Sequence, residues 1–171
     1  EQRLYKGEVD AMMLSPDWAM QPEQLIFSVG IMPYSDYLFA RTAEEVVQDV
    51  DQLQGKTICT RQYYVYPKLQ PLFATGTLVR LDSSSQEAQL RMVLNKRCDL
   101  VYMNDLIVYW LTEQKFAAVQ MFPAAIAVAQ SELNIALNPR WQPLLPRLNA
   151  FLVQQKQNGE VQRVTRRYVK R

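Results

Sequence analysis

The feature that most constrains the fold is an alternation of short strand-like and helix-like segments in the middle of the chain. Three segments are rich in β-branched and aromatic residues and predict strands: Thr57–Tyr66, Thr77–Leu81 and Cys98–Met103. Apolar residues at helical spacing follow Ser84, and Asp105–Gln114 predicts a second helix. Strands and helices in this rhythm favour an α/β fold with a parallel sheet.

Weaker signals extend this pattern toward both ends of the chain. Further strands are predicted at Val9–Leu14, Tyr37–Arg41, Phe116–Gln120 and Leu133–Leu137. Two capping-box patterns predict helix starts: Ser84-x-x-Glu87, and Thr42-x-x-Glu45 followed by Val46, Val47, Val50 and Leu53. Near the C-terminus, leucines at helical spacing predict a helix confined to the residues after Pro143 and Pro146. Asn158-Gly159 ends it, and a last short helix follows.

The composition excludes several classes of protein. The chain has 171 residues, of which 49% are apolar and 21% charged, as expected for a folded chain with its own core. It contains no histidine, the side chain most used in acid–base catalysis and the commonest metal ligand. Two cysteines are too few for a four-thiolate zinc site. We therefore predict no metal, no cofactor and no enzymatic activity.

Charge and hydropathy argue against nucleic-acid and membrane partners. The formal charge of +2 is too small to imply a nucleic acid. The basic residues of the last nine positions are interpreted as a solvated helix end: Arg163, Arg166, Arg167, Lys170 and Arg171. The longest apolar stretch, Met121–Ala129, is too short to span a bilayer, so no membrane insertion is expected.

Several short motifs follow one another along the chain. They are Lys6-Gly7-Glu8-Val9-Asp10-Ala11 with Phe27-Ser28, Leu53-Gln54-Gly55-Lys56-Thr57-Ile58, Cys98-Asp99-Leu100-Val101, Leu148-Asn149, Asn158-Gly159-Glu160 and Val164-Thr165-Arg166-Arg167-Tyr168. In this order and spacing they resemble the motifs of the extracellular solute-binding proteins of family 3. These have the type 2 periplasmic binding fold and serve amino-acid ABC importers.

The resemblance implies two α/β lobes joined by two crossover strands, with a ligand bound in the cleft between the lobes. Residues 37–115 would form a complete second lobe, and residues 1–36 and 116–171 part of the first. The family's opening strand and helix have no counterpart before Glu1. We therefore expect either a fragment of a longer exported precursor or a shortened family member. The implied location is the periplasm, with a signal peptide in the precursor but not in this chain.

Ligand-site candidates follow from the rule that ligands bind at the carboxyl ends of strands in α/β sheets. They are Ser15, Asp17 and Trp18 after the first strand, Tyr34 near the first crossover, Arg61, Gln62, Tyr63 and Tyr64 after the Thr57 strand, and Asn104 and Asp105 after the Cys98 strand. More ordinary roles compete with this one. We favour packing for the three aromatic residues Trp18, Tyr63 and Tyr64 and helix capping for Asp105, and Arg61 suits a solvated surface equally well.

The chain departs from the resembled family at the contacts that hold an amino acid. The arginine that clamps the ligand carboxylate is missing from residues 17–22. Tyr63-Tyr64 replaces the family's Gly-Ser/Thr turn, and the aspartate that pairs with the ligand ammonium falls on Asn104, although Asp105 is adjacent. A standard α-amino acid is therefore not the expected ligand. Arg61 would supply a compensating positive charge, and the aromatic residues would stack on a flat ligand.

The leading functional prediction is a periplasmic solute-binding protein that delivers a small polar molecule to an ABC permease. The alternative is a sensory or regulatory domain of the same fold that signals to a partner protein. An enzyme is disfavoured because the sequence has no histidine, no Gly-x-Ser-x-Gly motif and no carboxylate pair. The resemblance would place Cys59 and Cys98 on neighbouring strands, where we favour buried thiols over a disulfide.

Overall fold

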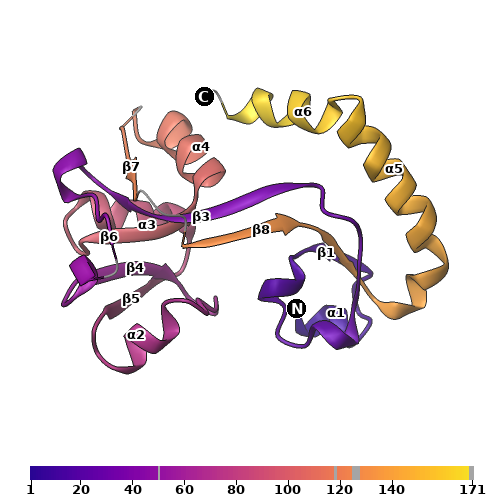
Figure 1. The fold of residues 1–171 in the computed structure, drawn as a ribbon, viewed down its shortest axis with the longest axis horizontal. Helices are drawn as coiled ribbons and strands as arrows, with labels where there is room; N and C mark the ends of the chain where they lie inside the picture. The colour runs from indigo at the N-terminus through magenta and orange to yellow at the C-terminus, as the bar shows by residue number, and fades with distance from the viewer. Residues whose placement is uncertain (50, 118, 125–127, 170–171) are drawn as a thin grey trace. The chain divides into compact units, whose positions relative to one another are not determined.

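The structure is a computed structural model that describes residues 1–49, 51–117, 119–124 and 128–169 (Figure 1). The chain divides into two compact units. Unit 1 comprises Glu1–Tyr34 and Ser131–Lys170, and unit 2 comprises Ser35–Gln130. The chain passes between the units twice, within strands β3 (Met32–Ala40) and β8 (Ala129–Leu133).

Unit 2 is built on a mixed sheet in the order β5-β4-β6-β3-β7, with β8 also paired to β3. The strands are β4 (Thr57–Arg61), β5 (Val79–Ser83), β6 (Leu100–Asn104) and β7 (Phe122–Pro123). β4 is parallel to β5 and β6, whereas β3 is antiparallel to β6 and β7. The predicted α/β class is confirmed, and its parallel sheet corresponds to the three strands β5, β4 and β6.

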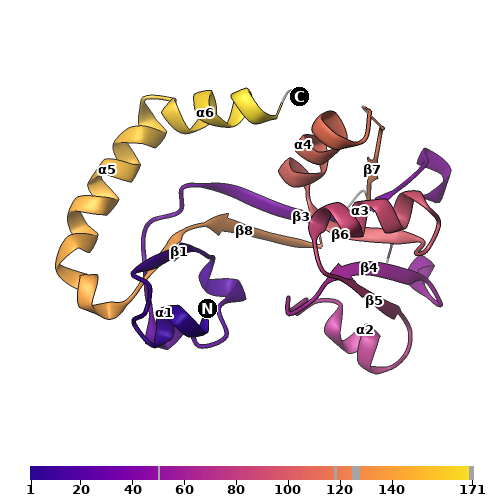
Figure 2. The ribbon, with the colours of Figure 1, turned by 180° about the vertical axis from the view of Figure 1, so that it is seen from behind.

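Two apolar cores lie on opposite faces of this sheet, because side chains alternate between the faces along each strand. Along β6, Leu100 and Tyr102 enter one core while Val101 and Met103 enter the other. Helices α3 (Gln86–Leu94) and α4 (Asp105–Lys115) cover the face of Val101, and α2 (Gln70–Ala74) covers the face of Leu100 (Figures 1 and 2).

Cys59 and Cys98 form a disulfide, so the favoured interpretation of buried thiols is wrong. Cys59 pairs across the sheet with Val101, not with Cys98. Cys98 lies before β6 begins, in the turn that follows α3, and its Cα is 5.7 Å from that of Cys59. This distance is typical of disulfides. The objection from cross-strand geometry does not apply, because the two residues are not cross-strand neighbours.

Some predicted elements differ in the structure. The Thr42-x-x-Glu45 pattern opens no α-helix but only 3₁₀ turns at Ala43–Glu45 and Asp51–Leu53, and Val50 lies outside the described residues. Thr42 makes no side-chain cap bond, and Glu45 instead pairs with Arg41, Oε1 to Nη2, at 2.6 Å. Arg41 also donates hydrogen bonds to carbonyls near the disulfide, which fixes it there.

Two other boundaries moved for local reasons. The helix expected after Ser84 is capped by Ser85, whose Oγ accepts a hydrogen bond from the Ala88 amide at 3.0 Å. The strand predicted at Phe116–Gln120 is not formed in its described residues, because α4 continues to Lys115 and Ala117 has a positive φ of 52°. Residue 118 lies outside the described residues.

Unit 1 contains a small antiparallel sheet in the order β1 (Ala11–Met13), β9 (Ile135–Leu137), β2 (Ile26–Phe27). Helix α1 (Gln2–Tyr5) packs on it through Leu4, which is fully buried. The remaining short elements are 3₁₀ turns at Pro16–Trp18, Pro22–Gln24 and Pro139–Leu144.

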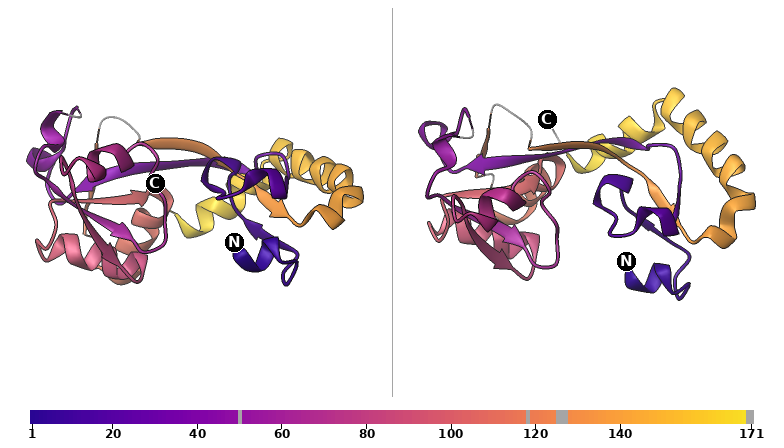
Figure 3. Two further views of the ribbon diagram at one scale, coloured as in Figure 1. Left: turned by 90° about the horizontal axis from the view of Figure 1, so that it is seen from below. Right: turned by 60° about the horizontal axis from the view of Figure 1, so that its bottom comes forward.

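The C-terminal helices of unit 1 follow the prediction. α5 (Leu145–Gln157) carries Pro146 in its first turn, and Pro143 falls in the 3₁₀ turn before it. α6 (Glu160–Tyr168) begins after Gly159, whose φ of +77° allows the bend between the two helices (Figures 1 and 3). No helix in the described parts of the chain is long and apolar enough to cross a membrane.

Gly30 is a position where a side chain cannot be added without displacement. A Cβ built on Gly30 would lie 2.6 Å from the Cβ of Glu132. We therefore expect Gly30→Ala to lower the free energy of unfolding by about 1–3 kcal/mol, the usual cost of overpacking. Urea unfolding measures this loss. In a Glu132→Gly background the clash is absent, so the same substitution should cost much less, and an equal cost in both backgrounds would contradict the steric explanation.

Candidate functional site

The carboxyl ends of the parallel strands β4, β5 and β6 meet at one edge of the sheet in unit 2. The last residue of β4 and the turn after it lie at this edge, together with the last residue of β6 and the first of α4. We call these residues the strand-end cluster: Arg61, Gln62, Tyr63, Tyr64, Asn104 and Asp105. The structure thus places the predicted site residues of unit 2 at a common edge.

Arg61 is the cationic member of the strand-end cluster. Its side chain is half-buried, and Nη1 donates to the backbone oxygen of Ser83 at 3.4 Å. The guanidinium carbon lies 5.9 Å from the centroid of the Tyr64 ring, a cation–π distance. None of the ion pairs among the described residues involves Arg61. Its charge is therefore held in place by neutral groups.

Tyr63 and Tyr64 are on the surface, so the packing role that we favoured for them is wrong. Tyr63 is 98% exposed and Tyr64 53% exposed. Tyr63 also has a φ of 65°, in the left-handed region that bulky residues rarely occupy. Gln62 is exposed too, and its backbone N–H donates to the backbone oxygen of Ser83 at 3.0 Å.

Asn104 and Asp105 belong to the start of α4. Asn104 is the N-cap: its Oδ1 accepts from the Leu106 amide at 3.0 Å, and its Nδ2 donates to the Ser35 oxygen at 2.9 Å. Asp105 Oδ1 accepts from the same Leu106 amide at 2.8 Å. The capping role favoured for Asp105 is therefore present, and Asn104 shares it. Because Asn104 is almost fully buried, both ends of its amide serve the fold.

Asp36 is a member of this edge that the sequence analysis missed. It lies in β3 in register with Asn104 and is 9% exposed. Its Oδ2 accepts from the Tyr102 hydroxyl at 3.1 Å. Burial raises the pKa of Asp36 to about 6, the negative charge of Asp105 adds to the rise, and hydrogen bonds from Tyr102 and Asn104 oppose it. A carboxylate within the largely uncharged strand Met32–Ala40 was the signal available in the sequence.

The predicted site residues of unit 1 lie together in that unit. Ser131 links two of them, since its Oγ lies 2.5 Å from Ser15 Oγ and donates to Asp17 Oδ2 at 2.6 Å. Trp18 and Tyr34 form an edge-to-face pair with ring centroids 5.1 Å apart. Trp18 also packs against the apolar core of unit 1, which confirms its packing role. Ser131 was missed because a lone serine in a strand gives no signal.

A cavity of about 300 Å³ opens on the α2 face of unit 2. Its lining is mostly apolar and includes Leu38, Leu53, Leu69 and Leu72. None of the predicted site residues lines it. Its polar lining residues are Gln48, Asp49 and Lys68, and none of them was a predicted site residue. The strand-end cluster remains our candidate, because it lies at the carboxyl ends of the parallel strands.

The comparisons with known proteins concern the fold. No protein-family model and no curated protein matches the chain. Among solved structures, the GluR0 ligand-binding core of Nostoc punctiforme in complex with L-glutamate is 15% identical with a TM-score of 0.76, over 98% of this chain and 76% of that one. An arginine transport-system periplasmic binding protein of Legionella pneumophila is 20% identical with a TM-score of 0.71, over 98% and 75%.

A sensor domain is similar to the same extent. The histidine kinase sensor domain with similarity to periplasmic binding proteins is 16% identical with a TM-score of 0.78, over 99% of this chain and 73% of that one. Binding proteins and sensor domains of this architecture thus align with essentially the whole chain. The protein has the type 2 periplasmic-binding-protein fold that its sequence motifs predicted.

Proposed function

We propose that this protein is a non-enzymatic binding protein that holds a small polar ligand at the strand-end cluster. The observation that carries the proposal is Arg61, a guanidinium without a carboxylate partner among the described residues, which lies over the half-exposed ring of Tyr64 and is two residues from the exposed Tyr63. A guanidinium recognises a planar anion through two parallel hydrogen bonds, and aromatic rings stack on flat groups. Ligand-binding proteins among the similar structures support the assignment.

The expected ligand carries a flat anionic group and is not a standard α-amino acid. Three backbone N–H groups of the turn already have acceptors. That of Arg61 donates to Tyr66 Oη, that of Gln62 to Ser83 O, and that of Tyr64 to Arg61 O. They are therefore not available to cradle a carboxylate. The side-chain amide of Asn104 is likewise hydrogen-bonded to the backbone of Ser35 and Leu106. Recognition of an anion falls to the Arg61 side chain.

For the partner, we propose delivery of the ligand to an ABC permease from the periplasm. The similar structures include the substrate-binding protein of an amino-acid ABC transporter, which supports this assignment. The second candidate is ligand sensing with signalling to a partner protein, which the kinase sensor domain favours. The two differ in cells. Deletion of the gene abolishes uptake of the ligand if the protein serves transport, and abolishes a response without changing uptake if it serves sensing.

Three matched probes test the ligand class. Benzoate is flat and anionic, benzamide is flat and neutral, and cyclohexanecarboxylate is anionic but not flat. NMR titration of the protein should give the highest affinity for benzoate, with shifts at the amides of residues 61–64. L-Glutamate and L-arginine should bind more weakly than benzoate. Equal binding of all three probes, or tight binding of either amino acid, would contradict the proposal.

Arg61→Gln should weaken benzoate binding about tenfold to a hundredfold, because a hydrogen bond to a charged group contributes about 1.5–3 kcal/mol. Benzamide binding should change little, since it does not use the charge. Arg97→Gln is the control, because Arg97 is exposed in the turn after α3 and lies outside the strand-end cluster. If both variants lost benzoate binding equally, the effect would be one of net charge and Arg61 would have no specific role.

A further inference from the structure

Residues Arg61–Tyr66, which we call the aromatic turn, hold an unfavourable backbone conformation. Tyr63 is left-handed at φ 65° although its side chain is almost fully exposed and packs on nothing that would reward it. Such a residue costs about 1 kcal/mol or more and persists only where the surrounding structure determines it. The contacts that hold this conformation are therefore those made by the backbone of the turn at its base, the side where it joins the sheet.

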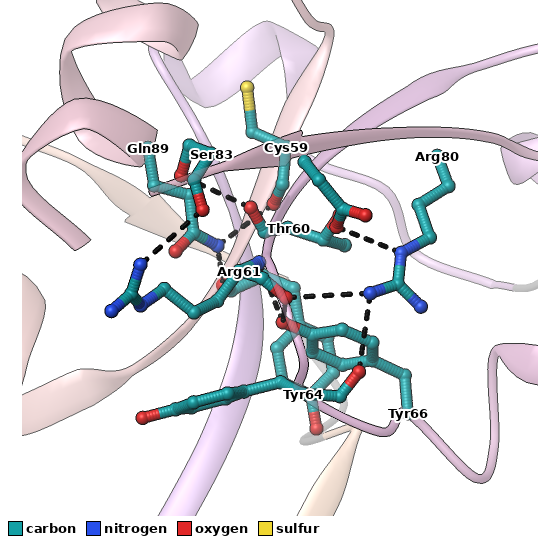
Figure 4. Close-up of polar contacts among 10 residues, drawn as sticks. Cys59, Thr60, Arg61, Tyr64, Tyr66, Arg80, Ser83 and Gln89 are labelled. Carbon is teal, nitrogen blue, oxygen red and sulfur yellow. Dashed lines mark hydrogen bonds and ion pairs between the residues drawn. The ribbon is translucent and has the colours of Figure 1, made fainter. Parts of the chain in front are cut away.

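Arg80 closes that base from the neighbouring strand β5. Its Nη2 donates to the backbone oxygen of Arg61 at 3.4 Å and to that of Tyr64 at 3.2 Å. These two carbonyls flank the left-handed residue Tyr63. Figure 4 shows the Arg80 guanidinium reaching the aromatic turn from one side, while the side chain of Arg61 extends toward Ser83 on the other. One nitrogen of Arg80 thus joins the carbonyls on both sides of Tyr63.

The Arg80 guanidinium is itself fixed. Its Nε pairs with Asp82 Oδ1 at 2.9 Å, and the same oxygen accepts from Thr60 Oγ1 at 2.7 Å. Its Cζ lies 5.1 Å from the Tyr66 ring centroid and 6.0 Å from that of Phe73. An arginine held by a carboxylate and two rings loses little further freedom when it binds the turn.

Tyr66 provides a second closure. Its hydroxyl accepts from the Arg61 amide at 2.8 Å and donates to the Arg61 oxygen at 3.4 Å. The ring is 3% exposed and packs edge-to-face on Tyr102 at 4.7 Å. Burial raises the pKa of Tyr66 to about 12, so the hydroxyl stays protonated and able to donate. Both closures act on the backbone of Arg61, the residue proposed to bind the anion.

We infer that Arg80 is a positioning residue of the ligand site: it holds the aromatic turn in the shape that presents Arg61, Tyr63 and Tyr64 together. This inference rests on the proposed function, because it assigns Arg80 a role in that same site. Arg80 acts through the two carbonyls of the turn and needs no contact with the ligand. Lysine cannot replace it, because a single ammonium group does not span Asp82 and the two carbonyls in the fixed geometry of a guanidinium.

The test compares Arg80→Lys with Arg91→Lys. Arg91 is a matched control, since it also pairs with a carboxylate, Glu87 at 3.0 Å, and lies over a ring, Phe116 at 5.4 Å, but it is not bonded to the turn. In Arg80→Lys we expect hydrogen exchange of the Tyr64 amide to accelerate about tenfold while amides of β4 and β6 are unchanged. Benzoate affinity should fall about fivefold or more, with the urea midpoint almost unchanged. Arg91→Lys should leave both readouts at the wild-type values.

Two outcomes would overturn the inference. One is unchanged Tyr64 exchange and benzoate affinity in Arg80→Lys. The other is faster exchange throughout unit 2, which would make Arg80 a general stabilising residue. A third result separates the two proposals: if the wild-type protein does not bind benzoate, the proposed ligand class fails. The exchange data on the aromatic turn then still decide whether Arg80 positions it. Tyr66→Phe, which removes the second closure, should produce the same local acceleration and serves if Arg80→Lys does not fold.

Discussion

Replacing both Cys59 and Cys98 by alanine is expected to lower the free energy of unfolding by about 4 kcal/mol. The disulfide joins residues separated by 39 positions, and a cross-link over a loop of this length removes much of the freedom of the unfolded chain. Both cysteine side chains are buried in the folded protein.

In the folded protein, side chains also donate hydrogen bonds to the backbone oxygens of the two cysteines. Gln89, 1% exposed, donates from Nε2 to the Cys59 oxygen at 3.0 Å and to the Tyr102 oxygen at 2.6 Å. Arg41 donates to the Cys98 oxygen at 2.9 Å. Because these contacts do not depend on the disulfide, we expect the reduced protein to keep the same fold with a lower free energy of unfolding.

Urea unfolding of four samples separates the contribution of the disulfide from that of the cysteine side chains. They are the oxidised wild-type protein, the same protein reduced with dithiothreitol, and the double alanine variant with and without the reductant. Reduction should lower the midpoint for the wild-type protein and leave the double variant unchanged. Thiol counting of the oxidised, denatured wild-type chain should find no free thiol. Two free thiols, or equal midpoints for the oxidised and reduced wild-type protein, would contradict the expectation.

Sequence patterns predicted the sheet of unit 2 because burial of its central strand leaves a visible pattern in the sequence. β6 is buried on both faces, so its sequence is a continuous apolar run that stands out without any alignment. Thr42-x-x-Glu45 failed because its glutamate pairs with Arg41, and Arg41 is held in place by the distant backbone oxygens of Val93 and Cys98. A local motif carries no information about such a competitor. The strand at Phe116–Gln120 failed because α4 continues to Lys115 and Phe116 packs against the core on the Val101 face.

The site was predicted less completely than the fold. The rule of strand ends located Arg61 and Asn104 at one edge, because it depends only on topology. Whether a side chain there is free depends on its neighbours in space. The side chain of Asn104 caps α4, and the turn that contains Tyr63 is bonded through two carbonyls to Arg80, 17 residues further along the sequence. Neither fact has a counterpart in the linear sequence.

Asp36→Asn is expected to stabilise the protein at neutral pH relative to the wild type, and the gain should disappear in acid. Burial raises the pKa of Asp36 from its ordinary 3.8 to about 6. At about 1.4 kcal/mol per pKa unit, this rise corresponds to about 3 kcal/mol. Asparagine retains an oxygen that can accept the Tyr102 hydroxyl and carries no charge to desolvate.

The sign follows from the two pKa values. Below pH 3.8 the carboxyl is protonated in both the folded and the unfolded chain, so its contribution to stability is fully present. As the pH rises through 3.8 the unfolded chain releases the proton while the folded chain retains it, so wild-type stability falls until about pH 6. Above that pH both forms are ionised, and the folded state contains a desolvated charge beside Asp105.

The measurement is the difference in unfolding free energy between Asp36→Asn and the wild type at pH 4 and at pH 8. Other carboxyl groups titrate in both proteins and largely cancel in that difference. We expect it to grow by about 2–3 kcal/mol between the two pH values. Asp51→Asn, which changes an exposed aspartate, should show a much smaller change. A difference for Asp36 that is the same at both pH values would mean that its carboxyl is solvated or paired in the folded protein.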